Sequence, residues 1–435
     1  MYKRILFFLL VFINTAILCI PLWFFLKKKS KDVFEPIYAS CAYIFLIFII
    51  RSIYIYINGS PFLGHFPFDN VTYYKFIQAL LLVFFSTLIL IVGYYSKFGK
   101  IIALKLPKKK LYWKKNNLFF MTFIFMFISL SSFYLLLKKI GGLRYYLLNK
   151  HEVLTLSGTT FLKFGINFLI YTVSIYLIYF LITKKYKHMY ILVLLLSLTY
   201  GFFSGSKSIF LGIILSNMII YHYLKKRIKL TQIIIFILIV LIVFPFFNIY
   251  RNLDNFNDLK KGFKALTQIT TIMNSFLSRF HDIDSLTYIL RDTPNTMKFQ
   301  YGKTILKLFV AWIPRSLWEN KPIISFAKIF GETYYAEFFK GTGTAPSPTL
   351  IGEAYINFHI IGSFIISYII GVFLRFIYEY LINKKYSFGS IFLYSQIFLS
   401  LSMIWESDIV PSIINILMII FISIFVNITL SIKLR

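Results

Sequence analysis

The chain has 435 residues, of which 58% are hydrophobic and only 14% are charged. A soluble protein carries nearly twice that charged fraction, so the composition excludes an ordinary soluble enzyme. The formal net charge of +31 does not indicate a nucleic-acid-binding protein, because most lysines lie in short clusters between apolar runs, as in the cytoplasmic loops of membrane proteins.

Apolar runs long enough to cross the roughly 30 Å hydrocarbon core recur along the whole chain. We predict about eleven membrane-spanning helices, at residues 5–26, 33–57, 71–95, 118–137, 161–183, 189–204, 209–224, 230–250, 349–382, 388–404 and 409–432. The pattern favours an all-α polytopic membrane protein over a β-barrel, whose strands are alternating segments of about ten residues. A partly inserted segment near Ile305–Trp318 gives a competing count of twelve.

The lysine-rich connection Lys97–Lys115 sets the orientation. Placing it in the cytoplasm puts the N-terminus outside and the C-terminus inside. The chain then divides into about eight N-terminal spanning helices (1–250), a long extracytoplasmic segment (251–348) and about three C-terminal spanning helices (349–435). Apolar residues between Phe263 and Phe280 recur at helical spacing and predict an amphipathic surface helix in the long segment. Connections of this length are uncommon unless they are functional.

Ionisable residues near the membrane are the functional candidates, because charge is costly there. Arg251 ends an apolar run in IYRN, and Arg279 and His281 follow in SRFHD. Lys207 lies in SGSKS, at the tip of a short helical hairpin. An interfacial anchor or a solvated surface is the alternative role for each of them. The loop charges Arg144, His151, Glu152, Glu406 and Asp408 rank lower, because we interpret charges in loops as solvated.

Glu353 is the strongest single candidate. Ser347 and Pro348 predict the N-cap and first turn of a helix. Glu353 then lies more than one turn inside that helix, with Asn357 one turn further along the same face. A carboxylate there is expected to face a polar cavity, a partner such as Arg315, or both.

The run IPRSLWENKP, followed by SPTLIGEAYINFHIIG, resembles the Wzy-type oligosaccharide repeat-unit polymerases of O-antigen and capsule synthesis. The matching positions are Pro314, Arg315, Trp318, Lys321 and Pro322, then Gly352, Glu353, Tyr355 and Asn357. The SGSKS and IYRN elements resemble basic elements of the same family. The chain departs from the family at Lys207, where arginine is common, and at His359, where glycine is usual.

The resemblance implies a glycosyltransferase with GT-C-type architecture in the bacterial inner (plasma) membrane, with its active site on the extracytoplasmic face. It implies that donor and acceptor are oligosaccharides linked to undecaprenyl pyrophosphate. A chain-length regulator and a flippase are candidate partners, whereas no nucleic acid, metal, nucleotide or other cofactor is expected. An O-antigen ligase-like transferase and a lipid-linked oligosaccharide flippase are the alternatives.

The residue pattern and the resemblance together predict two groups of site residues. The predicted catalytic residues are Glu353, Arg315 and His281. The predicted substrate-binding residues are Arg251, Arg279, Lys207, Lys321, Asn357 and Trp318. Arginines suit a pyrophosphate because their planar guanidinium forms forked hydrogen bonds, and a carboxylate or histidine suits removal of a proton from the acceptor hydroxyl. For Trp318, an anchor at the membrane interface is the alternative to stacking on a sugar.

Overall fold

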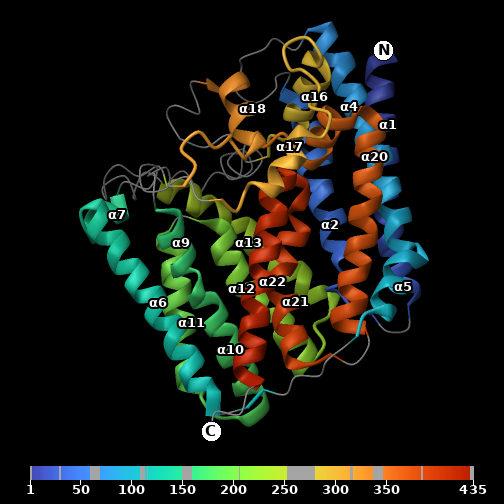
Figure 1. Cartoon of the computed structure of the whole chain (residues 1–435). Coiled ribbons are helices and arrows are strands. Elements are labelled where there is room, and N and C mark those ends of the chain that lie inside the picture. Colours follow the sequence, from blue (N-terminus) through green and yellow to red (C-terminus); the bar gives the residue numbers. More distant parts are fainter. Residues whose placement is uncertain are drawn as a thin grey trace. The chain divides into compact units, whose positions relative to one another are not determined.

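The computed structural model describes residues 2–28, 31–58, 69–107, 113–114, 116–148, 159–204, 206–251, 280–313, 317–336, 346–383 and 386–431. All secondary structure in these ranges is helical (Figure 1). The helices are α1 (Tyr2–Lys27), α2 (Pro36–Ile44), η1 (Phe45–Ile50), α3 (Arg51–Asn58), α4 (Asn70–Tyr95), α5 (Lys97–Lys105), α6 (Asn116–Ile140), α7 (Leu143–Leu148), α9 (Thr160–Ile166), α10 (Phe168–Thr183), α11 (Lys187–Phe203), α12 (Lys207–Leu224), α13 (Leu230–Arg251), α16 (Asp282–Asp292), α17 (Lys303–Leu306), η2 (Lys307–Phe309), α18 (Phe326–Tyr334), α20 (Leu350–Tyr378), η3 (Glu379–Asn383), α21 (Phe388–Ser402), η4 (Ile404–Glu406) and α22 (Ile409–Ser431).

Eight helical segments in the described part of the chain are long and apolar enough to cross a membrane. They are Lys3–Lys27, Pro36–Ile57, Asn70–Tyr95, Asn117–Ile140, Phe161–Thr183, Lys207–Leu224, Leu350–Asn383 and Ile409–Ser431. The prediction of an all-helical, multi-pass membrane protein is therefore confirmed. Shorter apolar helices at Lys187–Phe203, Leu230–Leu241 and Phe388–Ser402 coincide with the remaining predicted runs, and the count of eleven spans stays a prediction.

The chain forms two compact units. The first contains Met1–Pro107, Leu277–Tyr380 and Ser400–Met418, and the second contains Lys108–Phe276, Leu381–Leu399 and Ile419–Arg435. Each unit thus takes residues from all three of the segments that we distinguished in the sequence. The predicted amphipathic helix lies outside the described residues except for Phe280, which is buried.

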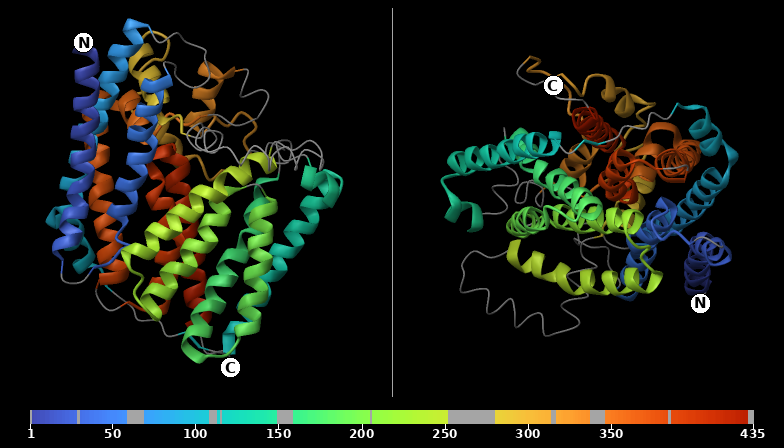
Figure 2. Two further views of the ribbon diagram at one scale, coloured as in Figure 1. Left: turned by 180° about the vertical axis from the view of Figure 1, so that it is seen from behind. Right: turned by 90° about the horizontal axis from the view of Figure 1, so that it is seen from below.

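In the first unit, α1 runs parallel to α4. Lys3 at the start of α1 donates a hydrogen bond to Asn70 at the start of α4, at 2.6 Å. Near the other end, the rings of Phe24 and Tyr95 pack with centroids 4.7 Å apart. The segment α2–η1–α3 runs in the opposite direction between them, because Tyr56 at its end stacks on Phe7 near the beginning of α1. Figure 2 shows these helices from behind.

The long helix α20 packs closely along α4. A side chain at Gly93 or Gly371 would collide with the backbone of the opposite helix, so these glycines allow the two backbones to approach. Phe85 lies beside Phe364, and Gly99, just after α4, lies against Arg375, so the two helices are parallel. α1, α4 and α20 therefore begin at the same end of the unit.

α20 is broken near its beginning. Phe358 has φ −141° and ψ 23°, and His359 has φ 59° and ψ −159°, so neither residue is helical. A positive φ of this kind is rare for a residue with a side chain and favours glycine. His359, where the polymerases that the motif resembles usually have glycine, is thus the residue of this break whose backbone conformation most favours glycine.

The beginning of α20 differs from its prediction by two residues. Thr349, not Ser347, is the N-cap, and its hydroxyl accepts a hydrogen bond from the backbone N–H of Gly352 at 3.0 Å. The Ser347 hydroxyl instead accepts from the backbone N–H of Thr349 at 3.2 Å, which forms a local turn before the helix. The sequence S-P-T offers two capping hydroxyls, and the fold uses the second.

The second unit is built around α10, which packs against α6, α11 and α12. The Ser129 hydroxyl on α6 donates to the backbone carbonyl of Gly165 at 3.1 Å, and the side chain of Gln396 on α21 donates to Ser174 on α10 at 2.8 Å. α11 and α12 form the expected hairpin, with Ser206 as the N-cap of α12 and Lys207 as its first residue.

Candidate functional site

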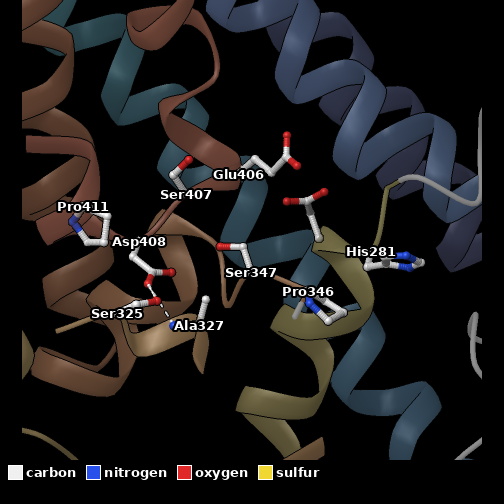
Figure 3. Close-up of a pocket in the computed structure, with 10 residues that line it drawn as sticks. His281, Ser325, Ala327, Pro346, Ser347, Glu406, Ser407, Asp408 and Pro411 are labelled. Atoms are coloured by element: carbon white, nitrogen blue, oxygen red, sulfur yellow. Dashed lines mark hydrogen bonds between the residues drawn. The ribbon is translucent and has the colours of Figure 1, made fainter. Parts of the chain in front are cut away.

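The first unit contains a pocket at a place where four helices begin (Figure 3). The residues that line it are His281, Asp282, Ser325, Ala327, Pro346, Ser347, Glu406, Ser407, Asp408 and Pro411. Its volume of about 350 Å³ lies within the range of small-ligand sites. The lining combines three carboxyl groups with a histidine and three serines, so the pocket is suited to a ligand rich in hydroxyl groups.

Each of the four helices contributes its N-terminal end. His281 is the N-cap of α16, Ser325 is the N-cap of α18, Ser347 lies just before α20, and Asp408 immediately precedes α22. The N-terminus of a helix carries partial positive charge and backbone N–H groups without helical partners. These helix ends stabilise the carboxylates that gather here.

Asp408 holds the start of α18. Its Oδ2 atom accepts hydrogen bonds from the Ser325 hydroxyl at 2.7 Å and from the backbone N–H of Ala327 at 2.9 Å. Burial raises the pKa of Asp408, and these hydrogen bonds oppose that shift. The interpretation of Asp408 as a solvated loop charge is wrong, because the chain folds it against a helix that lies 81 residues earlier in the sequence.

Glu406 lines the pocket from η4, and His281 lines it from the start of α16 with its ring directed away from Glu406 (Figure 3). The phenol of Tyr43, which lies inside the candidate span Pro36–Ile57, donates a hydrogen bond to Oε2 of Glu406. Burial raises the pKa of Glu406 to about 7. A carboxyl group with a pKa close to 7 is suited to accept a proton from a bound hydroxyl at physiological pH. Glu406 is thus half-buried and hydrogen-bonded, although its place in a short loop suggests a solvated charge.

A buried ion pair fixes the helix that carries His281. Nη2 and Nε of Arg51 donate to Oδ2 of Asp284 at 2.7 Å and 3.1 Å, and the two side chains are 0% and 1% exposed. Arg51 begins α3 inside a candidate span, and Asp284 lies in the first turn of α16. The pair attaches the start of α16, and with it one wall of the pocket, to the membrane-spanning helices. Neither residue was singled out in the sequence.

Glu353 does not line the pocket. It is 1% exposed, and its Oε2 atom accepts a hydrogen bond from the backbone N–H of Ile409 at 2.7 Å. Because Ile409 is the first residue of α22, Glu353 joins the beginnings of α20 and α22. Its carboxylate therefore holds the residue that follows the pocket residue Asp408, and its catalytic role stays a prediction.

Three other predicted site residues are described in the same unit. The Asn357 side chain accepts from the backbone N–H of Gly302 at 2.9 Å and donates to the Thr304 hydroxyl at 2.7 Å. Nζ of Lys321 donates to two backbone carbonyls. Trp318 is exposed. None of the three lines the pocket, and their substrate-binding roles stay predictions.

The predicted arginines lie largely beyond what the structure describes. Arg279 and Arg315 lie outside the described residues, as does the side chain of Arg251, whose backbone ends α13. Arg279 nevertheless precedes the pocket residue His281 by two positions in the sequence. Lys207 begins α12 in the second unit.

Metal ligation finds no support in the ranges that the structure describes, where no three His, Cys, Asp or Glu side chains are arranged to hold an ion. No protein-family model, curated protein or solved structure matches this chain. The function is therefore inferred from the chemistry of the pocket, the membrane-spanning helices and the motifs described above.

Proposed function

We propose that this protein is a glycosyltransferase that polymerises oligosaccharide repeat units linked to undecaprenyl pyrophosphate into O-antigen or capsular polysaccharide. It crosses the bacterial inner (plasma) membrane about eleven times in a GT-C-type arrangement, and its active site faces the extracytoplasmic side. The observation that carries the proposal is the pocket lined by three carboxyl groups, among them Glu406, which accepts a hydrogen bond from Tyr43. The IPRSLWENKP and SPTLIGEAYINFHIIG motifs support the same assignment.

In the proposed reaction, Glu406 accepts the proton of a hydroxyl group on the acceptor sugar. The resulting oxygen nucleophile attacks the anomeric carbon of the donor glycan. The bond between that carbon and the pyrophosphate oxygen breaks, and undecaprenyl pyrophosphate leaves with the bonding electrons. Asp282 is placed to accept hydrogen bonds from neighbouring sugar hydroxyls, because it lines the same pocket as Glu406.

The leaving pyrophosphate requires fixed positive charge, which the pocket's carboxylates do not supply. We assign this role to the guanidinium groups of Arg315, Arg279 and Arg251, since a planar fork donates two hydrogen bonds to one phosphate group. Glu353 takes a positioning role in this scheme, because it holds the start of α22 directly after the pocket residue Asp408.

The test is polymer synthesis by purified enzyme in lipid vesicles supplied with lipid-linked repeat units. Glu406→Gln should lower the rate by about 10²–10⁴-fold, as expected for loss of a general base. The wild-type rate should rise with pH through about 7, as the Glu406 carboxyl loses its proton. Glu332→Gln is the matched control, because Glu332 is an exposed glutamate on α18 that does not line the pocket.

Three outcomes would contradict the proposal. A wild-type rate of polymer formation from Glu406→Gln removes Glu406 from the reaction. Transfer of the glycan only to a non-polymeric acceptor identifies a ligase, which shares the donor but not the acceptor. Movement of the intact lipid-linked unit across the vesicle membrane, without a new glycosidic bond, identifies a flippase.

The orientation has its own test. Single cysteines that replace Lys260 and Lys108, in a protein without Cys19 and Cys41, are exposed to a membrane-impermeant thiol reagent on intact cells. Labelling at 260 and protection at 108 are expected. The reverse pattern would place the pocket on the cytoplasmic side and exclude the proposed substrates.

A further inference from the structure

Large apolar side chains are exposed in residues 301–313 and 317–318, between α16 and α18. Tyr301 is 75% exposed, Phe309 is 78% exposed and Leu317 is 80% exposed, and Leu306 and Trp312 are also exposed. So many exposed large apolar side chains in one short segment are unusual in water, although Lys303 in the same segment is exposed as well. We call residues 301–313 together with 317–318 the apolar shelf.

The apolar shelf is attached to the break in α20. The backbone N–H of Gln300 donates to the carbonyl of Ile356 at 2.9 Å, and Asn357 bonds to both Gly302 and Thr304. Asn357 lies seven residues after Leu350, which is about 10 Å along the helix at about 1.5 Å per residue. The attachment point therefore lies within the candidate span Leu350–Asn383, near its beginning.

The apolar shelf also continues the lipid-facing side of α20. Phe358, Ile360 and Ile361 are exposed within this candidate span, where apolar side chains are expected to face lipid. A Cβ atom at Gly302 would lie 3.2 Å from the ring of Phe358, so the shelf begins in contact with that surface. The exposed apolar side chains of the shelf and those of the helix thus adjoin each other.

Lys321 satisfies backbone groups of the apolar shelf. Its ammonium group donates to the carbonyl oxygen of Ala311 at 2.8 Å and to that of Ile313 at 2.7 Å. Water satisfies such carbonyls in a surface loop, but irregular backbone at membrane depth requires partners from the protein. A lysine used in this way is expected where the chain leaves helical structure next to lipid.

We infer that the apolar shelf is inserted among the acyl chains of the membrane leaflet in which α20 begins. The three observations above carry this inference: the exposed apolar side chains, their continuity with the lipid-facing side of α20, and the Lys321 hydrogen bonds. Trp312 and Trp318 suit the boundary of this layer, because tryptophan is enriched at membrane interfaces. The inference does not depend on the proposed reaction.

The test uses nitroxide labels on the full-length protein in vesicles of phosphatidylethanolamine and phosphatidylglycerol. Cys19 and Cys41 are replaced by alanine, and single cysteines are introduced as Phe309→Cys and Leu317→Cys. Both native side chains are exposed, so the replacements leave the core intact. Ile361→Cys on α20 is the lipid-facing control, and Glu332→Cys on α18 is the water-facing control. The measured quantity is the ratio of collisions with oxygen, which concentrates in lipid, to collisions with a water-soluble nickel complex.

We expect the ratio of oxygen to nickel collisions at positions 309 and 317 to match that at the lipid-facing position 361. It should be several times higher than the ratio at the water-facing position 332. Frequent nickel collisions at 309 and 317 would place the apolar shelf in water and overturn the inference. Protection from both reagents would show that protein, such as a second copy of this chain, covers the shelf, and would overturn it equally. Lys321→Met should lower the ratio of oxygen to nickel collisions at 309, because the carbonyl groups that lose the lysine form hydrogen bonds with water instead. Lys328→Met on α18 should leave this ratio unchanged.

Discussion

Glu353 and Ile409 join two helices that begin beside the same pocket. Oε2 of Glu353 accepts the backbone N–H of Ile409 at 2.7 Å, although 56 residues separate them in the sequence. This N–H is among the first of α22 and has no partner within its own helix. The carboxylate therefore acts as an N-terminal cap supplied by a different helix, which explains why an acidic residue is buried here.

We expect Glu353→Gln to fold and to keep most of the polymerising activity, because the amide oxygen accepts the same hydrogen bond. Glu353→Ala leaves the Ile409 N–H without a partner, which costs about 1–3 kcal/mol for a buried group. Thermal unfolding in detergent, combined with the polymer assay, measures both effects. If Glu353→Gln unfolds like the wild type but makes no polymer, the carboxylate itself is catalytic, as the sequence predicts.

Loss of the ion pair between Arg51 and Asp284 should lower the stability of the protein strongly. Removal of one member of a buried pair leaves the other charge without compensation, at a cost of about 3–5 kcal/mol. We expect Asp284→Asn and Arg51→Met each to lower the unfolding temperature strongly. The double replacement Arg51→Met with Asp284→Leu should recover much of the loss, because no buried charge remains. Equal losses in the double and single variants would show that packing, not charge, dominates this contact.

His359 should be replaceable by glycine with a gain in stability. Its backbone, at φ 59° and ψ −159°, lies in a region where strain of about 1–3 kcal/mol is usual for a residue with a side chain. Glycine relieves that strain. The gain in stability is reduced because glycine makes the unfolded chain more flexible. It is reduced further because the ring contacts of His359 with Tyr355 and Phe299 are lost. We expect a net increase of about 1 kcal/mol, measured by thermal unfolding, whereas His359→Ala should give no increase.

Local sequence patterns predicted the positions of the apolar helices well. Each predicted apolar run coincides with an apolar helix, because a run of about twenty apolar residues has few other stable structures in a membrane. The motif near the C-terminus lies close to the pocket, since α18, α20 and the pocket residue Ser347 lie in or beside it.

Local sequence patterns could not predict which polar residues form hydrogen bonds with each other in the folded protein. Arg51 and Asp284 are 233 residues apart, and Tyr43 and Glu406 are 363 residues apart. Glu406 suggests a solvated charge in the sequence because it lies in a short connection beside Ser407 and Asp408, and only tertiary packing brings the phenol of Tyr43 to it. The break at Phe358 and His359 is equally hidden, because no glycine or proline occurs at those two positions.

The predicted arginines are tested by replacement with lysine, which keeps the charge but loses the planar fork. We expect Arg315→Lys, Arg279→Lys and Arg251→Lys each to lower polymer yield sharply at an unchanged level of protein, with the largest loss at Arg315. Binding of undecaprenyl pyrophosphate to the purified variants gives a second readout that does not depend on turnover. Normal polymer from all three variants would make these arginines membrane anchors and exclude them as ligands of the pyrophosphate.

The final prediction concerns the effect of pH on stability through Glu406. Burial raises the pKa of this carboxyl from 4.5 to about 7 in the folded protein. Between these values the folded state binds more protons than the unfolded state, so the free energy of unfolding falls as pH rises from about 4.5 through 7. Glutamine carries no titrating proton, and Glu406→Gln removes this loss.

We therefore expect Glu406→Gln to unfold at a higher temperature than the wild type at pH 8 and at nearly the same temperature at pH 5. The same variant should be inactive in the polymer assay, so stability and activity should change in opposite directions at one residue. Glu332→Gln is the control, since its exposed carboxylate pairs only loosely with Lys328 at 3.9 Å. A stability difference that does not change with pH would mean that Glu406 ionises near its ordinary pKa, and the proposed base would lose its main support.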